Sequence, residues 1–342
     1  MKYYFISLNG YGEMFKKKFK DTSLFSYAKK EHFDSIISSG KWGYLFLGET
    51  LERGYYNLFD EEKNFPGEAF IRGWQDITSP EGITLFLSRF MAQSEGKVIE
   101  ENITISEKEI EELLNAVSEN KQKFKFFIRN RNPIIIFQKN FPDEKVPPPD
   151  NMKGKEAILN CYKNKEIKDL IISFNYILEN HPVNKVRQDL GEMQANLLWL
   201  WGMGKYKKAP NLKETLKKEL FYFSCEEDYL YLPEFLGFKR IDNITELPDN
   251  SFVWINSTVD KKSNYSAWLK KFEWIDREVI MYVVQEYKKR NCRALFIFDG
   301  FISPDIELKN CWVPFFFISE NYDKIRFRKK FKGQSLLKLF LE

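Results

Sequence analysis

The chain has 342 residues, which is long enough for two domains, and its 43% hydrophobic and 30% charged residues are the balance of an ordinary globular protein. Its 53 basic and 49 acidic side chains are spread along the whole sequence and leave a net charge of +4, which excludes a strongly basic nucleic-acid-binding protein. The four cysteines lie far apart without CxxC spacing, so we expect reduced thiols rather than a zinc or redox site.

The first element is a short apolar run, residues 3–8, that ends at Asn9 and Gly10. It is too short for the core of a signal peptide, and no other run approaches the length of a membrane span, so we expect a cytoplasmic protein without a membrane partner. The run is typical of a buried first strand. A helical pattern over residues 26–39 and an apolar run over residues 42–47 complete a β-loop-α-β unit.

The middle of the chain has a different pattern. A helix is predicted over residues 107–120, where Ser106 and Glu109 have the spacing of a capping box. The prolines at 147–149 predict a loop before a long helical pattern over residues 155–180. Short strands are predicted around these helices, at residues 83–91, 103–105, 124–129 and 133–138. The segment therefore predicts a small α+β domain.

The last third returns to the first pattern. An apolar strand over residues 251–256 precedes a helix over residues 266–290 and a second strand over residues 294–298, which ends at Asp299. Apolar strands that alternate with amphipathic helices predict a mostly parallel sheet, which binds ligands beyond the carboxyl ends of its strands. Three polar residues fall at such ends: Asn9, Asp260 and Asp299. The basic run at 324–332 alternates with apolar residues, and we favour a solvated strand over a phosphate-binding patch.

One long string in the chain is idiosyncratic. Residues 181–187 read HPVNKVR and residues 194–205 read QANLLWLWGMGK. This string resembles the segment that joins the two domains of archaeal-type, cofactor-independent phosphoglycerate mutases, which belong to the alkaline phosphatase superfamily. Shorter matches follow in the same order along the chain, at residues 27–34, 59–63, 97–99 and 313–315.

The resemblance implies a fold with two parts. It is an α/β fold: an alkaline-phosphatase-like, mostly parallel sheet flanked by helices, with a smaller α+β domain inserted into it. We place the discontinuous core at residues 1–74 and 190–342, and the inserted domain with its joining segment at residues 75–189. His181 belongs to the joining segment, where we favour a buried, hydrogen-bonded structural role over catalysis.

The family uses a serine nucleophile and two divalent ions, usually Mn²⁺ or Mg²⁺, and most of these positions are altered here. Glu49 stands where the serine is expected, with Thr50 beside it. Asn9 replaces the first aspartate ligand, and Asn264 replaces a histidine ligand. The stretch 67–69, Gly-Glu-Ala, stands where the family has a phosphate-binding Gly-Arg-Gly.

Only Asp260 and Asp299 remain as metal ligands by this comparison. Two aspartates without imidazole neighbours hold divalent ions weakly, so we expect no bound cofactor, with a single Mg²⁺ or Mn²⁺ held together with Asn9 and Glu49 as the alternative. The sequence favours a catalytically inactive, phosphoglycerate mutase-like protein that acts as a binding, regulatory or scaffold protein. Its partner would be another protein or a small phosphorylated ligand, not nucleic acid. The alternative is an active mutase, or a metal-dependent phosphatase, with a rearranged site.

Overall fold

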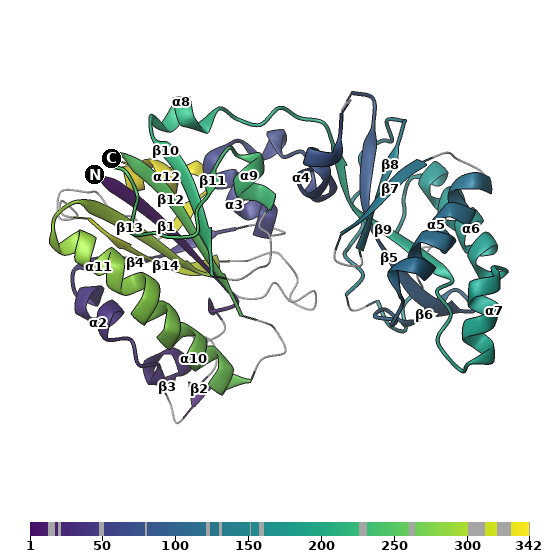
Figure 1. The fold of residues 1–342 in the computed structure, drawn as a ribbon, viewed down its shortest axis with the longest axis horizontal. Coiled ribbons are helices and arrows are strands. Elements are labelled where there is room, and N and C mark those ends of the chain that lie inside the picture. The colour runs from purple at the N-terminus through teal and green to yellow at the C-terminus, as the bar shows by residue number, and fades with distance from the viewer. Residues whose placement is uncertain are drawn as a thin grey trace. The chain divides into compact units, whose positions relative to one another are not determined.

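The chain folds into two compact units (Figure 1). The computed structural model describes residues 1–12, 18–19, 22–47, 51–78, 81–120, 124–129, 132–150, 152–156, 161–225, 231–259, 264–299, 312–319 and 330–341. The first unit is formed by Met1–Phe65 and Ala209–Glu342, and the second by Pro66–Lys208. None of the helices in these described ranges has the length and apolar character that crossing a membrane requires.

The first unit is built on an eight-stranded sheet with the order β11-β10-β12-β1-β13-β14-β4-β15. Its pairs are parallel except where β14 meets β13 and β4. The mostly parallel α/β sheet expected from the sequence is therefore confirmed. Its strands are β1 (Lys2–Asn9), β4 (Gly40–Phe46), β10 (Glu219–Ser224), β11 (Lys239–Arg240), β12 (Ser251–Thr258), β13 (Cys292–Phe298), β14 (Trp312–Ile318) and β15 (Lys330–Lys332). The short strands β2 (Lys18–Phe19) and β3 (Thr22–Ser23) form a separate pair.

Helices cover both faces of this sheet, because its central strands are apolar on both sides. Residues of α2 (Glu31–Ile37), α10 (Tyr265–Ile275), the π-helix η4 (Asp276–Ile280) and α11 (Met281–Lys288) share a core with Tyr4, Ile6 and Leu8 of β1. The opposite face of β1 carries Phe5, whose ring packs against Tyr55 of α3 (Leu51–Phe59). Helix α12 (Gln334–Leu341) covers the same face. The remaining helices of this unit are η1 (Leu24–Tyr27), η2 (Glu62–Asn64), α8 (Leu212–Leu216) and α9 (Tyr231–Phe235).

The second unit contains a five-stranded sheet whose pairs are antiparallel, with β5 at its centre. Its strands are β5 (Thr84–Ser94), β6 (Lys97–Glu100), β7 (Phe124–Arg129), β8 (Asn132–Phe137) and β9 (Leu197–Lys205). Its helices are α4 (Glu68–Gly73), η3 (Trp74–Asp76), α5 (Glu107–Asn120), α6 (Lys165–Glu179) and α7 (Pro182–Asp189). The inserted α+β architecture follows from the alternation of these strands and helices.

The string that carries the family resemblance stabilises the second unit through a helix cap and buried hydrogen bonds. His181 caps α7, because its Nδ1 accepts a hydrogen bond from the backbone N–H of Val183 at 3.3 Å. The buried Asn184 amide donates to the carbonyls of Leu178 and Ala195 and accepts from the N–H of Ala195 at 2.7 Å. The string therefore has a structural function, and His181 has the hydrogen-bonded role that its sequence neighbours indicated.

Three details differ from the sequence predictions. The helix expected over residues 155–180 begins only at Lys165, because Asn164 accepts hydrogen bonds from two N–H groups of the first turn and caps it there. Residues 103–105 do not form a strand, since this segment runs into the capping box of α5. The units divide at Phe65 and Ala209, whereas the sequence placed the boundaries after residues 74 and 189. Strand β9 belongs to the second unit, because it pairs with β5 over most of its length.

Candidate functional site

Polar residues follow two neighbouring strands at the carboxyl edge of the first sheet. Asn9 is the last residue of β1, and Asp299 follows β13 directly. These strands run parallel with Leu8 opposite Phe298, and Asn9 lies opposite Thr258 of β12 on its other side. This edge is where α/β proteins bind ligands. The fold therefore places Asn9 and Asp299 side by side at the expected edge.

Asp299 is completely buried, and both of its carboxylate oxygens accept hydrogen bonds. Oδ1 accepts from the backbone N–H of Gly10 at 2.9 Å. Oδ2 accepts from the hydroxyl of Tyr55 at 2.5 Å. Gly10 has φ of 87°, a backbone conformation that residues with side chains rarely adopt, and this turn directs its N–H to the carboxylate. The Asn9-Gly10 turn thus retains a structural purpose.

Tyr55 comes from α3 and stays protonated at neutral pH. Its ring is buried against Phe5 and Trp254, with ring centroids 5.9 and 5.5 Å away. Burial, together with the negative charge and the hydrogen bond of Asp299, raises the pKa of Tyr55 well above its ordinary value. The phenol is therefore a permanent donor to the carboxylate.

Asn9 is held by amide and hydroxyl partners. Its Nδ2 donates to Oδ1 of Asn256 at 2.8 Å and lies 3.3 Å from Oγ1 of Thr258. Its Oδ1 lies 3.2 Å from the hydroxyl of Tyr55, a longer contact than the one between Tyr55 and Asp299. The position therefore contributes a neutral amide whose nitrogen is already hydrogen-bonded to Asn256.

The hydrogen bonds continue into the sheet. Oγ of Ser7 donates to Oδ1 of Asn256 at 3.0 Å and accepts from Nε1 of Trp254 at 2.9 Å. All of these side chains are less than one tenth exposed. We call the following six residues the buried polar network: Ser7, Asn9, Tyr55, Trp254, Asn256 and Asp299.

Comparison with known proteins gives the geometry its context. No family model matches the chain. Over 95 residues, 27% of this chain, it is 27% identical to the 2,3-bisphosphoglycerate-independent phosphoglycerate mutase 2 of Methanothermobacter thermautotrophicus. Over 89 residues it is 33% identical to the 2,3-bisphosphoglycerate-independent phosphoglycerate mutase of Methanosarcina barkeri. These matches span only 24% and 22% of the two relatives, about a quarter of their length.

Two solved structures share the fold over almost the whole chain. A cofactor-independent phosphoglycerate mutase from Thermoplasma acidophilum has a TM-score of 0.57, with 99% of this chain and 98% of that chain covered at 16% identity. A protein from Pyrococcus horikoshii has a TM-score of 0.63, with 99% and 96% covered at 15% identity. The chain resembles the cofactor-independent phosphoglycerate mutases. The resemblance expected from the sequence string is confirmed, and the two structures, at identities this low, establish the fold alone.

The two divalent ions that such a mutase would carry do not fit the residues described at this edge. Mg²⁺ and Mn²⁺ favour several oxygen ligands, among which anionic carboxylates offset the cost of dehydration. Asp299 supplies one carboxylate, whose two oxygens are already bound by Tyr55 and Gly10, and Asn9 supplies no charge. Among the described residues, no group of three or more His, Cys, Asp and Glu side chains is placed to hold an ion.

The other predicted positions of the mutase-like site divide into two groups. Asn264 caps α10, because its Oδ1 accepts a hydrogen bond from the N–H of Ala267 at 2.9 Å. Its side chain therefore serves the helix start, a common role for asparagine. Glu49, Thr50 and Asp260 lie outside the described residues.

Sequence reasoning named Asn9 and Asp299 and missed the other four members of the buried polar network, Ser7, Tyr55, Trp254 and Asn256. A signal for Asn256 was present, because Ser7 and Asn256 are polar residues inside otherwise apolar strands and predict a mutual partner in the core. Tyr55 gave no such signal. One aromatic residue in an amphipathic helix does not indicate where its hydroxyl will point.

Proposed function

We propose that this chain is a phosphoglycerate mutase-like protein that does not catalyse phosphoryl transfer and instead acts as a binding, regulatory or scaffold protein. The hydrogen bond from Tyr55 to Asp299 carries the proposal. A metal ligand must offer a free lone pair toward a site that an ion can reach. Here the hydroxyl of Tyr55 takes Oδ2, and the carboxylate is completely buried.

The cost of recovering a metal site supports this proposal. An ion that took the place of the Tyr55 hydroxyl at Oδ2 of Asp299 would leave that buried hydroxyl without this partner, at a cost of about 1–3 kcal/mol. Asn9 would add no charge to compensate, because its amide is neutral and hydrogen-bonded to Asn256. Metal binding at this edge therefore starts from an unfavourable exchange of partners.

A direct assay tests the proposal. The protein is tested for interconversion of 3-phosphoglycerate and 2-phosphoglycerate and for hydrolysis of p-nitrophenyl phosphate, with Mn²⁺, Mg²⁺ or Co²⁺ added. We expect no turnover above the background that an Asp299→Asn variant gives in the same preparation. Turnover that disappears in Asp299→Asn, Glu49→Ala or Thr50→Ala would contradict the proposal.

The second candidate is an active mutase or metal-dependent phosphatase with a rearranged site. The observation that favours it is the likeness of fold over 99% of the chain to a cofactor-independent phosphoglycerate mutase, with an aspartate still at the end of β13. This candidate requires at least one divalent ion, Mg²⁺ or Mn²⁺, with ligands from Glu49 and Asp260. Activity with one added metal and none with a chelator would support it.

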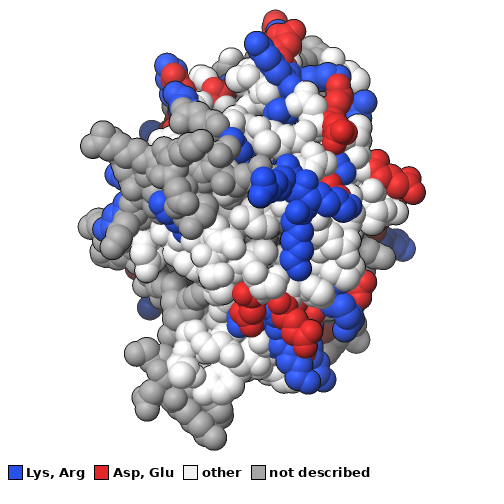
Figure 2. Space-filling model, turned by 90° about the vertical axis from the view of Figure 1, so that its left-hand side faces the viewer, with Lys and Arg blue, Asp and Glu red and all other residues white. Residues whose placement is uncertain are grey.

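The same proposal includes a cytoplasmic location and one partner, which is either another protein or a small phosphorylated ligand. The face drawn in Figure 2 carries Lys and Arg side chains interspersed with Asp and Glu, an arrangement that does not favour nucleic acid. No disulfide joins the described cysteines, Cys161, Cys225 and Cys292, which agrees with the reducing compartment of this proposal. Affinity purification of the full chain from its source cell should return a defined partner, and recovery of a solitary monomer would count against a scaffold.

A further inference from the structure

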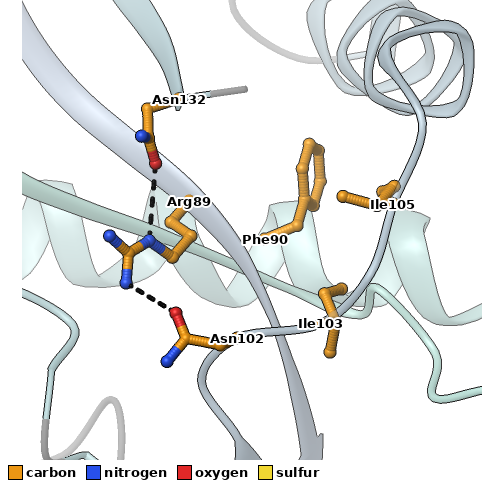
Figure 3. A pocket seen from close by; sticks show the side chains of 6 residues that line it. All are labelled: Arg89, Phe90, Asn102, Ile103, Ile105 and Asn132. Atoms are coloured by element: carbon orange, nitrogen blue, oxygen red, sulfur yellow. Dashed lines mark hydrogen bonds between the residues drawn. The ribbon is translucent and has the colours of Figure 1, made fainter. Parts of the chain in front are cut away.

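The second unit contains a pocket of about 210 Å³ with one polar and one apolar side (Figure 3). The polar side is formed by Arg89 of β5, which lies between Asn102 and Asn132. The apolar side is formed by Phe90, Ile103 and Ile105. Ile103 and Ile105 belong to the segment that leads into α5. This segment does not form a strand, and both side chains line the pocket.

The guanidinium of Arg89 is held in position by the protein. Nη1 donates to Oδ1 of Asn102 at 3.1 Å, and Nε lies 3.4 Å from Oδ1 of Asn132. The guanidinium carbon lies 5.7 Å from the ring of Trp201, a cation–π distance. Within the described ranges, Nη2 has no hydrogen-bond partner. A fixed guanidinium with one terminal nitrogen available is suited to bind an anion with little loss of conformational entropy.

The charge of Arg89 is already shared with Asp150, whose Oδ1 lies 3.2 Å from Nη1. The Asp150 side chain is 53% exposed, whereas that of Arg89 is 24% exposed. An exposed ion pair contributes little stability, so a ligand anion can compete with it or bind beside it. The pocket contains the positive charge of Arg89 and, beside it, the negative charge of Asp150. It can therefore compensate the single negative charge of a monoanion better than the nearly two negative charges that a phosphate monoester carries at pH 7.

We propose that this pocket binds a small amphipathic monocarboxylate. Its carboxylate accepts hydrogen bonds from Nη2 of Arg89, and its hydrocarbon part packs against the partly exposed Ile103 and Ile105. The site uses no residue of the buried polar network. Its failure and the failure of the proposed function are therefore distinguishable, since the first is measured as binding and the second as turnover.

The test uses benzoate and 4-methylvalerate as probes, titrated into the full chain and followed by ligand-observed NMR. We expect dissociation constants on the order of 1 mM for ligands of this size. Arg89→Gln should weaken binding by about tenfold or more, because a charged hydrogen-bond donor is lost. Asp150→Asn should strengthen it several-fold, because a competing carboxylate is removed. Lys205→Gln is the matched control, since Lys205 in the same unit also pairs with one exposed aspartate, Asp143.

Several results would overturn the proposal. One is unchanged affinity in a folded Arg89→Gln variant, and another is an equal loss in Lys205→Gln, which would indicate general electrostatic attraction. Tighter binding of 3-phosphoglycerate than of benzoate would overturn the ligand class. If Arg89→Gln does not fold, Asp150→Asn decides, because an affinity for benzoate that stays the same or falls in that variant contradicts the site.

Discussion

The hydroxyl of Tyr55 lies 2.5 Å from Oδ2 of Asp299, and this hydrogen bond joins helix α3 to the end of strand β13 inside the first unit. Asp299 is fully buried and Tyr55 is 4% exposed. A buried carboxylate is tolerated only when its oxygens are hydrogen-bonded or its charge is compensated. The tyrosine therefore contributes to the stability of the fold at the carboxyl edge of the first sheet.

Replacing Tyr55 by phenylalanine should destabilise the first unit. The change keeps the packed ring but removes the hydroxyl that donates to Oδ2 of Asp299, and losing a hydrogen bond to a charged group costs about 1.5–3 kcal/mol. The free energy of unfolding in urea measures this loss. Tyr44→Phe is the matched control, because Tyr44 in the same unit is 49% exposed and should change stability by less than about 0.5 kcal/mol. Equal stability of Tyr55→Phe and wild type would show that the hydrogen bond is not formed.

Divalent metals should not stabilise the protein through Asp299. A ligand that binds only the native state raises the melting temperature. At one hundred times its dissociation constant it adds about 2.7 kcal/mol to the free energy of unfolding. We expect the same Tm with and without millimolar Mg²⁺ or Mn²⁺, because Asp299 is completely buried and both of its oxygens already accept hydrogen bonds. Asp299→Asn separates specific from general effects. A metal-dependent rise in wild type that this variant lacks would establish a residual ion site.

More of the fold than of the candidate site could be predicted from the sequence. Runs such as residues 3–8 and 294–298 are apolar throughout, and a strand buried on both faces requires this local pattern. The contact between Tyr55 and Asp299 joins residues 244 positions apart, and its geometry depends on how α3 packs on the sheet. Local patterns contain no information about such a pairing. The helix start at Lys165 was missed for a related reason, since the capping by Asn164 outweighs a helical pattern that extends to residue 155.

The ion pair between Arg187 and Glu109 should make the second unit sensitive to acid. Burial alone would raise the pKa of Glu109, but hydrogen bonds from Ser106 and Arg187 outweigh it and leave the pKa below 4.5. Because the folded pKa is the lower one, the pair contributes its full stability above pH 4.5 and loses it as the pH falls through the folded pKa. The stability of the second unit should therefore decline below pH 4.5.

Glu109→Gln should remove this pH dependence at the cost of stability at pH 7. The variant gives Arg187, whose side chain is only 5% exposed, a neutral amide in place of its carboxylate partner at 2.8 Å, although Glu192 at 3.2 Å remains. We expect a loss of about 1–2 kcal/mol at pH 7 that shrinks toward zero near pH 3. Urea unfolding at both pH values measures it. Glu112→Gln on the same helix is the control, and a similar loss there would exclude a specific role for the pair with Arg187.

Gly67→Ala should be among the most damaging single changes in the second unit. Gly67 precedes α4 with φ of 94°, and an added Cβ would lie 2.0 Å from the carbonyl oxygen of Met203 in β9. The atoms that the added Cβ would meet belong to the backbone of Met203 and Gly204, which cannot rotate away as a flexible side chain could. Helix α4 and strand β9 would therefore have to separate. Because steric overlap adds to the strain of a positive φ, we expect a loss of about 3 kcal/mol or more, or failure to fold.

Gly154→Ala separates the two contributions to that loss. Gly154 has φ of 80°, close to that of Gly67, but an added Cβ meets nothing within 4 Å. The control should therefore lose only the cost of the backbone conformation, about 1 kcal/mol. The difference between the two variants in urea unfolding measures how tightly α4 packs against β9. If both variants lost the same free energy, the close approach of Gly67 to Met203 would not limit the choice of residue, and its backbone conformation alone would explain the glycine.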